Sequence, residues 1–234
     1  MKGKLIVFEG GEGSGKTTQL QRSQQWLESS GWLARLQQVL PSLANPLLVT
    51  REPGGTTLGI KLRQLLLSSD PEDAIQSRTE LLLFAADRAQ HVATRLQPHL
   101  EAGGLILCDR FTDSTVAYQG YGRGLSLVLI DQLNQIATDG LTSDLTLWLD
   151  LDVEMGLERS RQRLQQSGGG LDRIERGEIA FHQRVQQGFQ ALSQAAPERI
   201  VTIDASQPEA MVADKIQRIL EEKLWQWYPQ VSML

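Results

Sequence analysis

The chain has a single cysteine, Cys108, and three histidines, so it cannot form an internal disulfide and shows no histidine spacing typical of a metal site. None of its apolar runs approaches the roughly 20 residues that a membrane-spanning helix requires. The first strand-like run begins at Leu5, which leaves no room for a secretory signal. We therefore expect a cytoplasmic protein without a membrane partner.

A strong charge of either sign is also lacking. The formal net charge is −5 and the sequence pI is about 5.3, so no broad electrostatic attraction to nucleic acid is expected. An anionic substrate would instead need locally clustered arginines. With 234 residues and 41% hydrophobic positions, and with no repeat, the chain is predicted to form a single domain over residues 1–234.

Apolar runs predict five strands, at residues 4–9, 47–50, 105–109, 145–150 and 200–204. Their apolar positions are continuous rather than alternating, which is typical of parallel strands covered on both faces. Residues 16–30, 58–69, 77–102 and 208–228 carry helical spacing, while 37–46 and 164–171 look like loops or insertions. The pattern predicts an α/β fold of three layers, in which helices cover both faces of a parallel five-stranded sheet.

The most specific signal is a glycine-rich loop between the first strand and the first helix. Its sequence, Gly10-Gly11-Glu12-Gly13-Ser14-Gly15-Lys16-Thr17, fits the P-loop pattern G-x-x-x-x-G-K-[ST]. In such loops backbone N–H groups and the helix N-terminus hold phosphate oxygens. Lys16 adds a full charge and Thr17 is expected to bind Mg²⁺, so residues 10–17 with the adjacent Thr18 are predicted to bind ATP.

Several classes of protein share this loop, and the rest of the sequence distinguishes between them. The N-K-x-D motif of guanine-specific switches is absent, as are the size and linkers of a motor. Arginines are instead concentrated around predicted loops, as a protein that binds two phosphorylated molecules requires. They are Arg51, Arg63, Arg88, Arg110, Arg123, Arg159, Arg161, Arg163, Arg173 and Arg176.

Further motifs follow the predicted strands, whose carboxyl ends build ligand sites in parallel sheets. Thr-Arg-Glu-Pro-Gly-Gly-Thr at 50–56 follows the second strand, and Asp109-Arg110-Phe111 ends the third. Asp109 is placed to hold Mg²⁺ through water, as the Walker-B aspartate of P-loop ATPases does. Alternatively, Asp109 and Arg110 form a structural ion pair at the end of the strand and have no role in binding a metal.

Together these motifs resemble bacterial thymidylate kinase over most of the chain, from Lys4 to about Leu220. The matching segments, in the family's order, are Glu9 with the P-loop, 50–56, Phe-Ala-Ala-Asp-Arg at 84–88, Asp-Arg-Phe at 109–111, Ala-Tyr-Gln-Gly at 117–120 and Asp-Arg-Ile-Glu at 172–175. The resemblance implies transfer of the γ-phosphate of Mg-ATP to dTMP, giving dTDP for dTTP biosynthesis. It also implies a homodimer with a mobile lid.

The resemblance assigns a role to each matching position of the dTMP site. Phe84 would stack on thymine, Arg88 would bind its O4 atom and Thr115 would meet the base edge. Tyr118 would crowd the ribose 2′ position, and Gln119 belongs to the same site. Arg51 and Arg110 would grip the acceptor phosphate, whereas Glu9 matches an acid near the sugar 3′-hydroxyl and the metal.

The lid is expected at about residues 155–177. Kinases of this family take an extra catalytic arginine from either the P-loop or the lid, and residues 11–14 contain no base. We therefore predict that Lys16 and Arg110 act in catalysis with the lid residues Arg159 and Arg163, Arg173 being the second choice. The segment 164–171 is longer than is usual in the family, so which arginine reaches the phosphates stays open.

Two other functions remain possible at this point. One is a kinase for another monophosphate, such as dUMP or a broader set of deoxynucleotides; the pair Phe84 and Arg88 argues against purines. The other is a non-catalytic nucleotide sensor, which does not fit an intact Lys16, Thr17 and Asp109. The tryptophans Trp225 and Trp227 and the neighbouring Tyr228 match no family role, and we expect them to serve packing or dimer contact.

Overall fold

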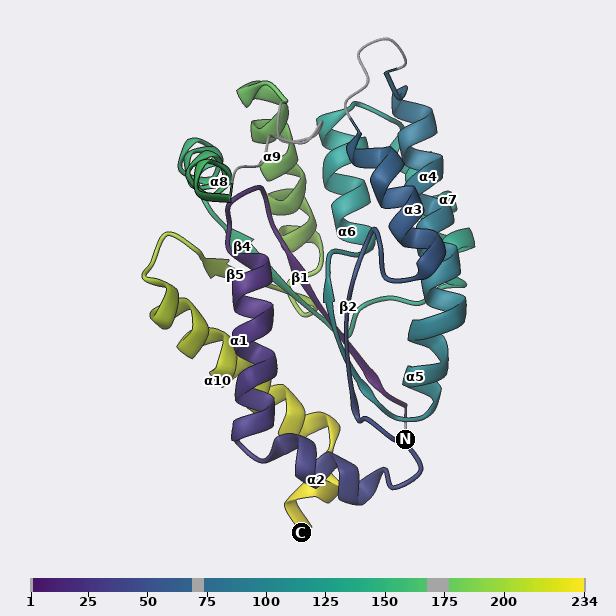
Figure 1. The fold of residues 1–234 in the computed structure, drawn as a ribbon, viewed down its shortest axis with the longest axis vertical. Helices are drawn as coiled ribbons and strands as arrows, with labels where there is room; N and C mark the ends of the chain where they lie inside the picture. The colour runs from purple at the N-terminus through teal and green to yellow at the C-terminus, as the bar shows by residue number, and fades with distance from the viewer. Residues whose placement is uncertain (1, 69–73, 168–176, 234) are drawn as a thin grey trace.

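The computed structural model describes residues 2–68, 74–167 and 177–233. Within them the centre is a parallel five-stranded sheet in the order β2-β3-β1-β4-β5 (Figure 1). The strands are β1 Lys4–Glu9, β2 Leu47–Arg51, β3 Leu105–Asp109, β4 Leu145–Asp150 and β5 Ile200–Asp204. The predicted strands are confirmed, and β2 is one residue longer than expected.

Both faces of the sheet are buried, because successive side chains of a strand point to opposite faces. Ile6 and Phe8 of β1 lie in one hydrophobic cluster, whereas Leu5 and Val7 lie in another on the opposite face. All four side chains are 0% exposed. This double burial explains the continuous apolar runs, and the three-layer α/β fold is confirmed.

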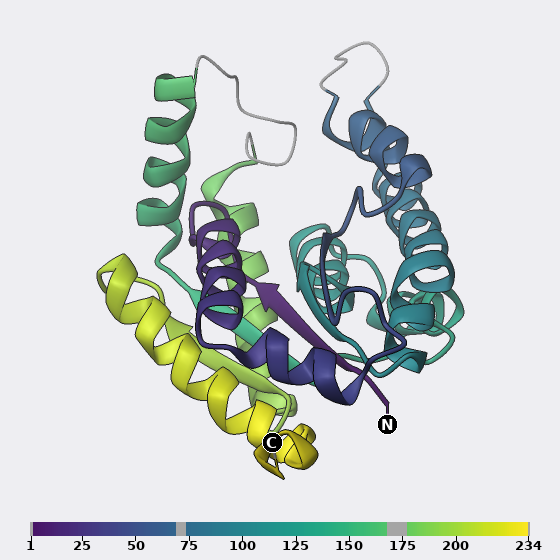
Figure 2. The same ribbon diagram turned by 60° about the horizontal axis from the view of Figure 1, so that its bottom comes forward.

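Two groups of helices cover these faces (Figures 1 and 2). One face is covered by α1 Lys16–Ser29, α2 Trp32–Val39 and α10 Glu209–Trp227, followed by the 3₁₀ turn η3 Pro229–Met233. The other is covered by α4 Ser77–His91, the π-helical segments η1 Val92–Leu96 and η2 Val116–Gly122, α5 Gln97–Glu101 and α9 Ile179–Ala195. The remaining helices are α3 Thr57–Leu67, α6 Thr112–Thr115, α7 Leu127–Thr138 and α8 Val153–Ser167.

The helix predictions were correct in place but not always in extent. The helix expected at 77–102 is divided into α4, η1 and α5, because residues 92–96 form a π-helical turn. The segment 37–46 was expected to be a loop throughout, yet residues 37–39 belong to α2. Trp32 and Leu36 of α2 are buried, and Leu33 and Val39 pack partly buried against the same cluster. These positions have helical spacing, but the helix is only eight residues long.

The aromatic residues near the C-terminus pack within this chain. Trp225 contacts Trp32 of α2 edge to face, with ring centroids 4.5 Å apart. Lys4 lies over Trp227, and the Tyr228 hydroxyl donates to the carbonyl oxygen of Gly103 at 3.3 Å. This end of α10 therefore closes the core beside α2.

Candidate functional site

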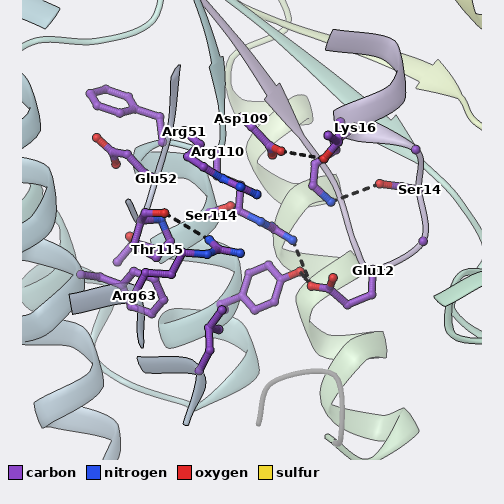
Figure 3. Close-up of a pocket in the computed structure, with 18 of the residues that line it drawn as sticks. Glu12, Ser14, Lys16, Arg51, Glu52, Arg63, Asp109, Arg110, Ser114 and Thr115 are labelled. Carbon is purple, nitrogen blue, oxygen red and sulfur yellow. Dashed lines mark hydrogen bonds and ion pairs between the residues drawn. The ribbon is translucent and has the colours of Figure 1, made fainter. Parts of the chain in front are cut away.

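A cleft of about 380 Å³ opens at the carboxyl edge of the sheet, beside β1, β2 and β3. Separate motifs of the sequence meet in its walls (Figure 3). The predicted site residues that line it are Glu12, Gly13, Ser14, Gly15, Lys16, Thr17, Thr18, Arg51, Phe84, Arg88, Asp109, Arg110, Thr115, Tyr118, Gln119 and Arg163. The fold thus brings most of the predicted residues to one cavity.

The P-loop depends on glycine where the backbone turns into α1. Gly13 and Gly15 have φ angles of 66° and 87°, which side-chain-bearing residues rarely adopt. A Cβ atom on Gly13 would also collide with the carbonyl oxygen of Gly156, in the first turns of α8. The P-loop and α8 therefore pack backbone against backbone.

Lys16 lines the cleft and is 8% exposed. Its Nζ atom donates to the carbonyl oxygens of Gly10 and Gly11, at 3.0 and 2.8 Å. Burial lowers the pKa of Lys16 to about 8, and nearby Arg110 acts in the same direction. The negative charge of a bound polyphosphate would favour the charged amine again.

Thr17 and Asp109 form a second polar pair beside Lys16. The Thr17 hydroxyl donates to Oδ2 of Asp109 at 3.0 Å. Oδ1 of Asp109 is buried and has no hydrogen-bond partner among the described residues. Because an unpaired buried carboxylate oxygen is costly, this atom is suited to a cation or to water bound by one.

Arg110 is held across the cleft by several contacts. Its guanidinium donates to Gly10 and Ser114, both at 3.1 Å, and to Glu12 at 3.0 Å. It also lies over the ring of Tyr118, 4.9 Å from the centroid. Its backbone φ of 71° is unusual for a residue other than glycine, and such strain persists where surrounding contacts fix it, often at functional sites.

Glu12 is the acid that neutralises Arg110 in this arrangement. Its Oε1 atom accepts hydrogen bonds from Arg110 and from the Tyr118 hydroxyl, the latter at 2.8 Å. Burial opposes ionisation of Glu12, but Arg110 and Lys16 outweigh it and lower its pKa to about 2. Glu12 is therefore a carboxylate at neutral pH, able to accept a hydrogen bond from a ligand hydroxyl.

Arg51, at the end of β2, is exposed on the wall of the same cleft. It pairs with Asp109 in the strand register, which brings it near Arg110 (Figure 3). No hydrogen bond or ion pair joins the Arg51 side chain to another of the described residues. Its charge is thus available to an anionic ligand.

Arg88 has a different environment, because its side chain is 2% exposed and makes four hydrogen bonds within the protein. Nε donates to Glu52 at 2.8 Å, and one terminal nitrogen donates to both Thr115 and Asn134 at 2.9 Å. The other terminal nitrogen donates to the carbonyl oxygen of Phe111 at 3.0 Å. Since guanidinium has five N–H donors, one is left for a ligand in the cleft.

Phe84, Tyr118 and Gln119 complete the wall near Arg88. Phe84 and Arg88 lie four residues apart on α4, as predicted, and therefore reach the same side of the cleft. Gln119 donates to Oε1 of the buried Glu80 at 2.7 Å, which fixes its amide.

Glu9 does not line the cleft. Its side chain is 0% exposed and accepts hydrogen bonds from the backbone N–H groups of Phe111 and Ser114 and from the Ser114 hydroxyl. Burial raises the pKa of Glu9 to about 7, with Asp113 contributing. Glu9 therefore holds residues 111–114 in place behind the site, and its position near the sugar 3′-hydroxyl and the metal stays a prediction.

Comparison with known proteins agrees with this arrangement. Residues 8–216 match the family model for thymidylate kinase. The chain belongs to the thymidylate kinase family. It is 96% identical, over the full length of both chains, to the thymidylate kinase of Cyanothece sp. (strain PCC 7425 / ATCC 29141). It is 57% identical to the thymidylate kinase of Acaryochloris marina, over 98% of this chain and all of that one.

A solved structure is also similar to this chain. The crystal structure of thymidylate kinase from Ehrlichia chaffeensis is 32% identical in sequence and matches with a TM-score of 0.68. The match covers 94% of this chain and 99% of that one. The likeness therefore extends over the whole fold, including the elements that build the cleft.

The predicted lid, at about residues 155–177, lies only in part within the described residues. Arg163 lies on α8, lines the main cleft and donates to Ser160 at 3.1 Å. Arg159 lines a second cavity of about 420 Å³, shared by the P-loop and residues 205–209, and donates to the carbonyl oxygen of Ala205. Arg173 and the motif at 172–175 lie outside the described residues.

Three residues of the site were not assigned a role from the sequence. Glu52 was part of a quoted motif, but its ion pair with Arg88 could be found only in three dimensions. Asn134 comes from α7 and His91 from the end of α4, and both reach the network around Arg88 and Glu52. The one sequence signal for this network was Glu52, an acidic residue inside the rigid loop 50–56.

Proposed function

We propose that this chain transfers the γ-phosphate of ATP to dTMP, giving dTDP and ADP, with both nucleotides meeting in the cleft beside the P-loop. The observation that carries the assignment is the set of groups that line one cavity. Lys16 of the P-loop, the arginines Arg51 and Arg110, and the pair Phe84 and Arg88 all lie in its walls. These groups suit a triphosphate, an acceptor phosphate and a base, respectively.

In this proposal the dTMP base stacks on Phe84, and its O4 atom accepts the remaining N–H of Arg88. Thr115 meets the base edge, Tyr118 and Gln119 surround the sugar and base, and Arg51 binds the acceptor phosphate. An aromatic ring has the area and flatness to hold a base face to face. An arginine that can only donate favours the carbonyl O4 of thymine over the amino group of cytosine.

The phosphates of ATP are proposed to lie on residues 10–18. Backbone N–H groups at the start of α1 and the charge of Lys16 would hold them. The second cavity, with Arg159 and residues 205–209, adjoins the same loop and is suited to the nucleoside end of ATP. Arg163, which lines the main cleft, is the lid arginine that we propose reaches the transferred phosphate.

The chemistry requires positioning and charge rather than a base. A phosphate monoester has a second pKa of about 6 and is largely ionised at neutral pH, so the dTMP oxygen can attack without losing a proton to the protein. The barrier comes from the approach of two anions and from charge on the transferred group. Lys16, Arg110 and Arg163 are proposed to neutralise that charge while Arg51 aligns the acceptor.

Mg²⁺ is proposed as the cofactor, held by Thr17 and, through water, by Asp109. The residues fit this ion, because hydroxyl and carboxylate oxygens are its preferred ligands and Oδ1 of Asp109 is buried without a hydrogen bond. When bound, Mg²⁺ would neutralise phosphate charge. Thr17 and Asp109 already share a hydrogen bond, so the two ligands are held together.

Arg88→Lys is expected to remove most of the preference for dTMP. A lysine amine cannot bind the four protein acceptors of Arg88 and the base together. We therefore expect kcat/KM for dTMP to fall about a hundredfold, and the ratio of kcat/KM for dTMP to that for dCMP to fall with it. Steady-state kinetics with both acceptors give the ratio, and circular dichroism confirms folding. Arg35→Lys, at an exposed position, is the matched control; a folded Arg88→Lys enzyme with the wild-type ratio would refute base recognition by Arg88.

We also propose that the enzyme is a homodimer that pairs through α3, α4 and α7. These helices lie side by side (Figure 1), and α4 packs against both of the others. Large apolar side chains are exposed on them: Leu58, Ile60, Leu65, Leu82, Leu127, Val128, Leu129 and Ile136. Exposed apolar residues grouped on neighbouring helices favour an interface with a second copy.

Ile136→Asp is expected to convert the dimer to a monomer, because Ile136 is 79% exposed and a buried unpaired carboxylate in the interface is costly. Sedimentation velocity measures the change. Met211→Asp, at an exposed apolar position of α10, is the control and should remain dimeric. A wild-type chain that sediments as a monomer would disprove the proposed assembly.

Localisation in the cytoplasm remains a proposal supported by the single cysteine, which fits a reducing compartment. None of the helices in the described part of the chain is long and apolar enough to cross a membrane. The net charge of −5 is consistent with small anionic nucleotides, rather than nucleic acid, as ligands.

A further inference from the structure

Beneath the proposed base site lies a buried polar chain that runs from β2 to Arg88. The Thr50 hydroxyl and Nε2 of His91 are 2.7 Å apart, and Nδ1 of His91 is 2.9 Å from Oε1 of Glu52. Oε2 of Glu52 accepts from Nε of Arg88 at 2.8 Å. The His91, Glu52 and Arg88 side chains are 0%, 2% and 2% exposed.

The chemistry of these groups fixes the direction of one hydrogen bond. A carboxylate only accepts, so Nδ1 of His91 carries a proton and donates to Glu52. Nε2 accepts from the Thr50 hydroxyl when the ring is neutral and donates to it when the ring is charged. Both ring nitrogens are hydrogen-bonded in either state, which holds the ring in one orientation.

Glu52 is the one charged partner of Arg88 among the described residues, since the other acceptors are the neutral Thr115, Asn134 and the carbonyl of Phe111. In a buried site the position of an arginine follows the carboxylate that compensates its charge, because leaving either charge uncompensated is costly. A contact that holds the Glu52 carboxylate in place therefore also helps to set the direction of the free N–H of Arg88.

His91 is placed to fix Glu52 and the loop that carries it. Gly55, in the same loop, packs so closely on the imidazole that a Cβ atom there would collide with the ring. Asp87, which precedes Arg88 on α4, accepts from the backbone N–H of Gly54 at 3.1 Å. The loop is thus attached to α4 through three residues, Asp87, Arg88 and His91.

We propose that His91 is a positioning residue that sets, through Glu52, the direction in which Arg88 presents its free N–H to the substrate base. The same ring contacts Thr50, whose neighbour Arg51 is the proposed phosphate ligand. His91 therefore also ties the base-reading end of the acceptor site to its phosphate end. The inference rests on the proposed role of Arg88.

Three substitutions of His91 separate its two hydrogen bonds. His91→Leu removes both at nearly constant volume. His91→Asn keeps a side-chain N–H close to the position of Nδ1, toward Glu52, whereas His91→Gln keeps a polar atom near Nε2, toward Thr50. The measurement is kcat and KM for dTMP and for dCMP with each purified full-length variant.

We expect His91→Leu and His91→Gln to lower the dTMP:dCMP ratio of kcat/KM by about tenfold, the size of the loss of a hydrogen bond to a charged group. The change should lie in KM for dTMP more than in kcat. His91→Asn should keep the ratio within about threefold of wild type. If His91→Leu does not fold, the comparison of the Asn and Gln variants carries the test.

Controls separate positioning from a general loss of stability. Leu36→Ala removes a fully buried side chain of α2, on the opposite face of the sheet; it should lower the melting temperature without changing the ratio. Equal ratios in wild type, His91→Asn and His91→Gln would overturn the inference. Arg88→Lys tells the two failures apart: if it alone changes the ratio, the proposed function stands and only the role of His91 is wrong.

Discussion

Lys16→Met is expected to lower kcat by roughly a thousandfold, the scale on which single charge-stabilising groups act in phosphoryl and acyl transfer. Lys16 is buried among the P-loop carbonyls, and its amine is proposed to neutralise the charge that develops on the transferred phosphate. Methionine keeps much of the length and volume of the side chain but no charge. ADP release at saturating Mg-ATP and dTMP measures the effect.

Two controls show whether the loss of kcat is specific to Lys16. Lys61→Met, at an exposed position of α3, removes the same charge away from the cleft and should leave kcat unchanged. The binding of dTMP alone to Lys16→Met should be close to that of wild type, because the amine is not proposed to touch the acceptor. A loss of kcat smaller than about tenfold would show that another group supplies the charge.

Arg110→Met is expected to lower kcat/KM for dTMP by about a hundred- to a thousandfold. Arg110 reaches the P-loop, Ser114 and Glu12 at once, and it is proposed to bridge acceptor and donor phosphates. Its loss should affect both kcat and KM for dTMP, since the group contacts the acceptor in the ground state and in the transition state.

Arg218→Met, at an exposed position of α10, provides the control for charge. Because Glu12 also loses its main partner in Arg110→Met, the double variant with Glu12→Gln distinguishes a lost arginine from a newly unpaired acid. Full recovery of activity in the double variant would contradict a direct role of Arg110. A persistent loss would support it.

The strands were predicted well because both faces of the sheet are buried. Each strand is a continuous apolar run, and the acid or arginine that ends it marks the edge where the site forms, as Asp109 does at the end of β3. Short elements were harder to predict. The helix α2 spans eight residues, and its apolar side chains Trp32, Leu36 and Val39 pack on the core that also holds Tyr228 near the C-terminus.

The site was predicted where its residues lie in contiguous motifs. Asp109 ends β3 and Lys16 begins α1 after the P-loop, while Phe84 and Arg88 share a face of one helix, so their convergence follows from local spacing. The supports of Arg88 could not be predicted in this way. Glu52, His91 and Asn134 come from three different elements, and their contacts exist only after the layers pack.

The surroundings of Glu9 also depend on packing. The resemblance places this acid near the sugar 3′-hydroxyl and the metal, and in the structure the backbone N–H groups of Phe111 and Ser114 hold its carboxylate behind the cleft. Glu12, two positions further into the loop than the first glycine, lies on the wall instead. Sequence spacing alone could not choose between two acids so close together.

The central claim is transfer of phosphate from ATP to dTMP, and ADP production tests it most directly. The purified full-length protein is incubated with ATP and Mg²⁺, and separately with dTMP, dUMP, dCMP, dGMP, UMP or no acceptor, with a parallel series in EDTA. The account predicts fast, magnesium-dependent ADP release with dTMP, slower release with the other acceptors and little without one. Release that does not depend on an acceptor, or none with any of them, would contradict it.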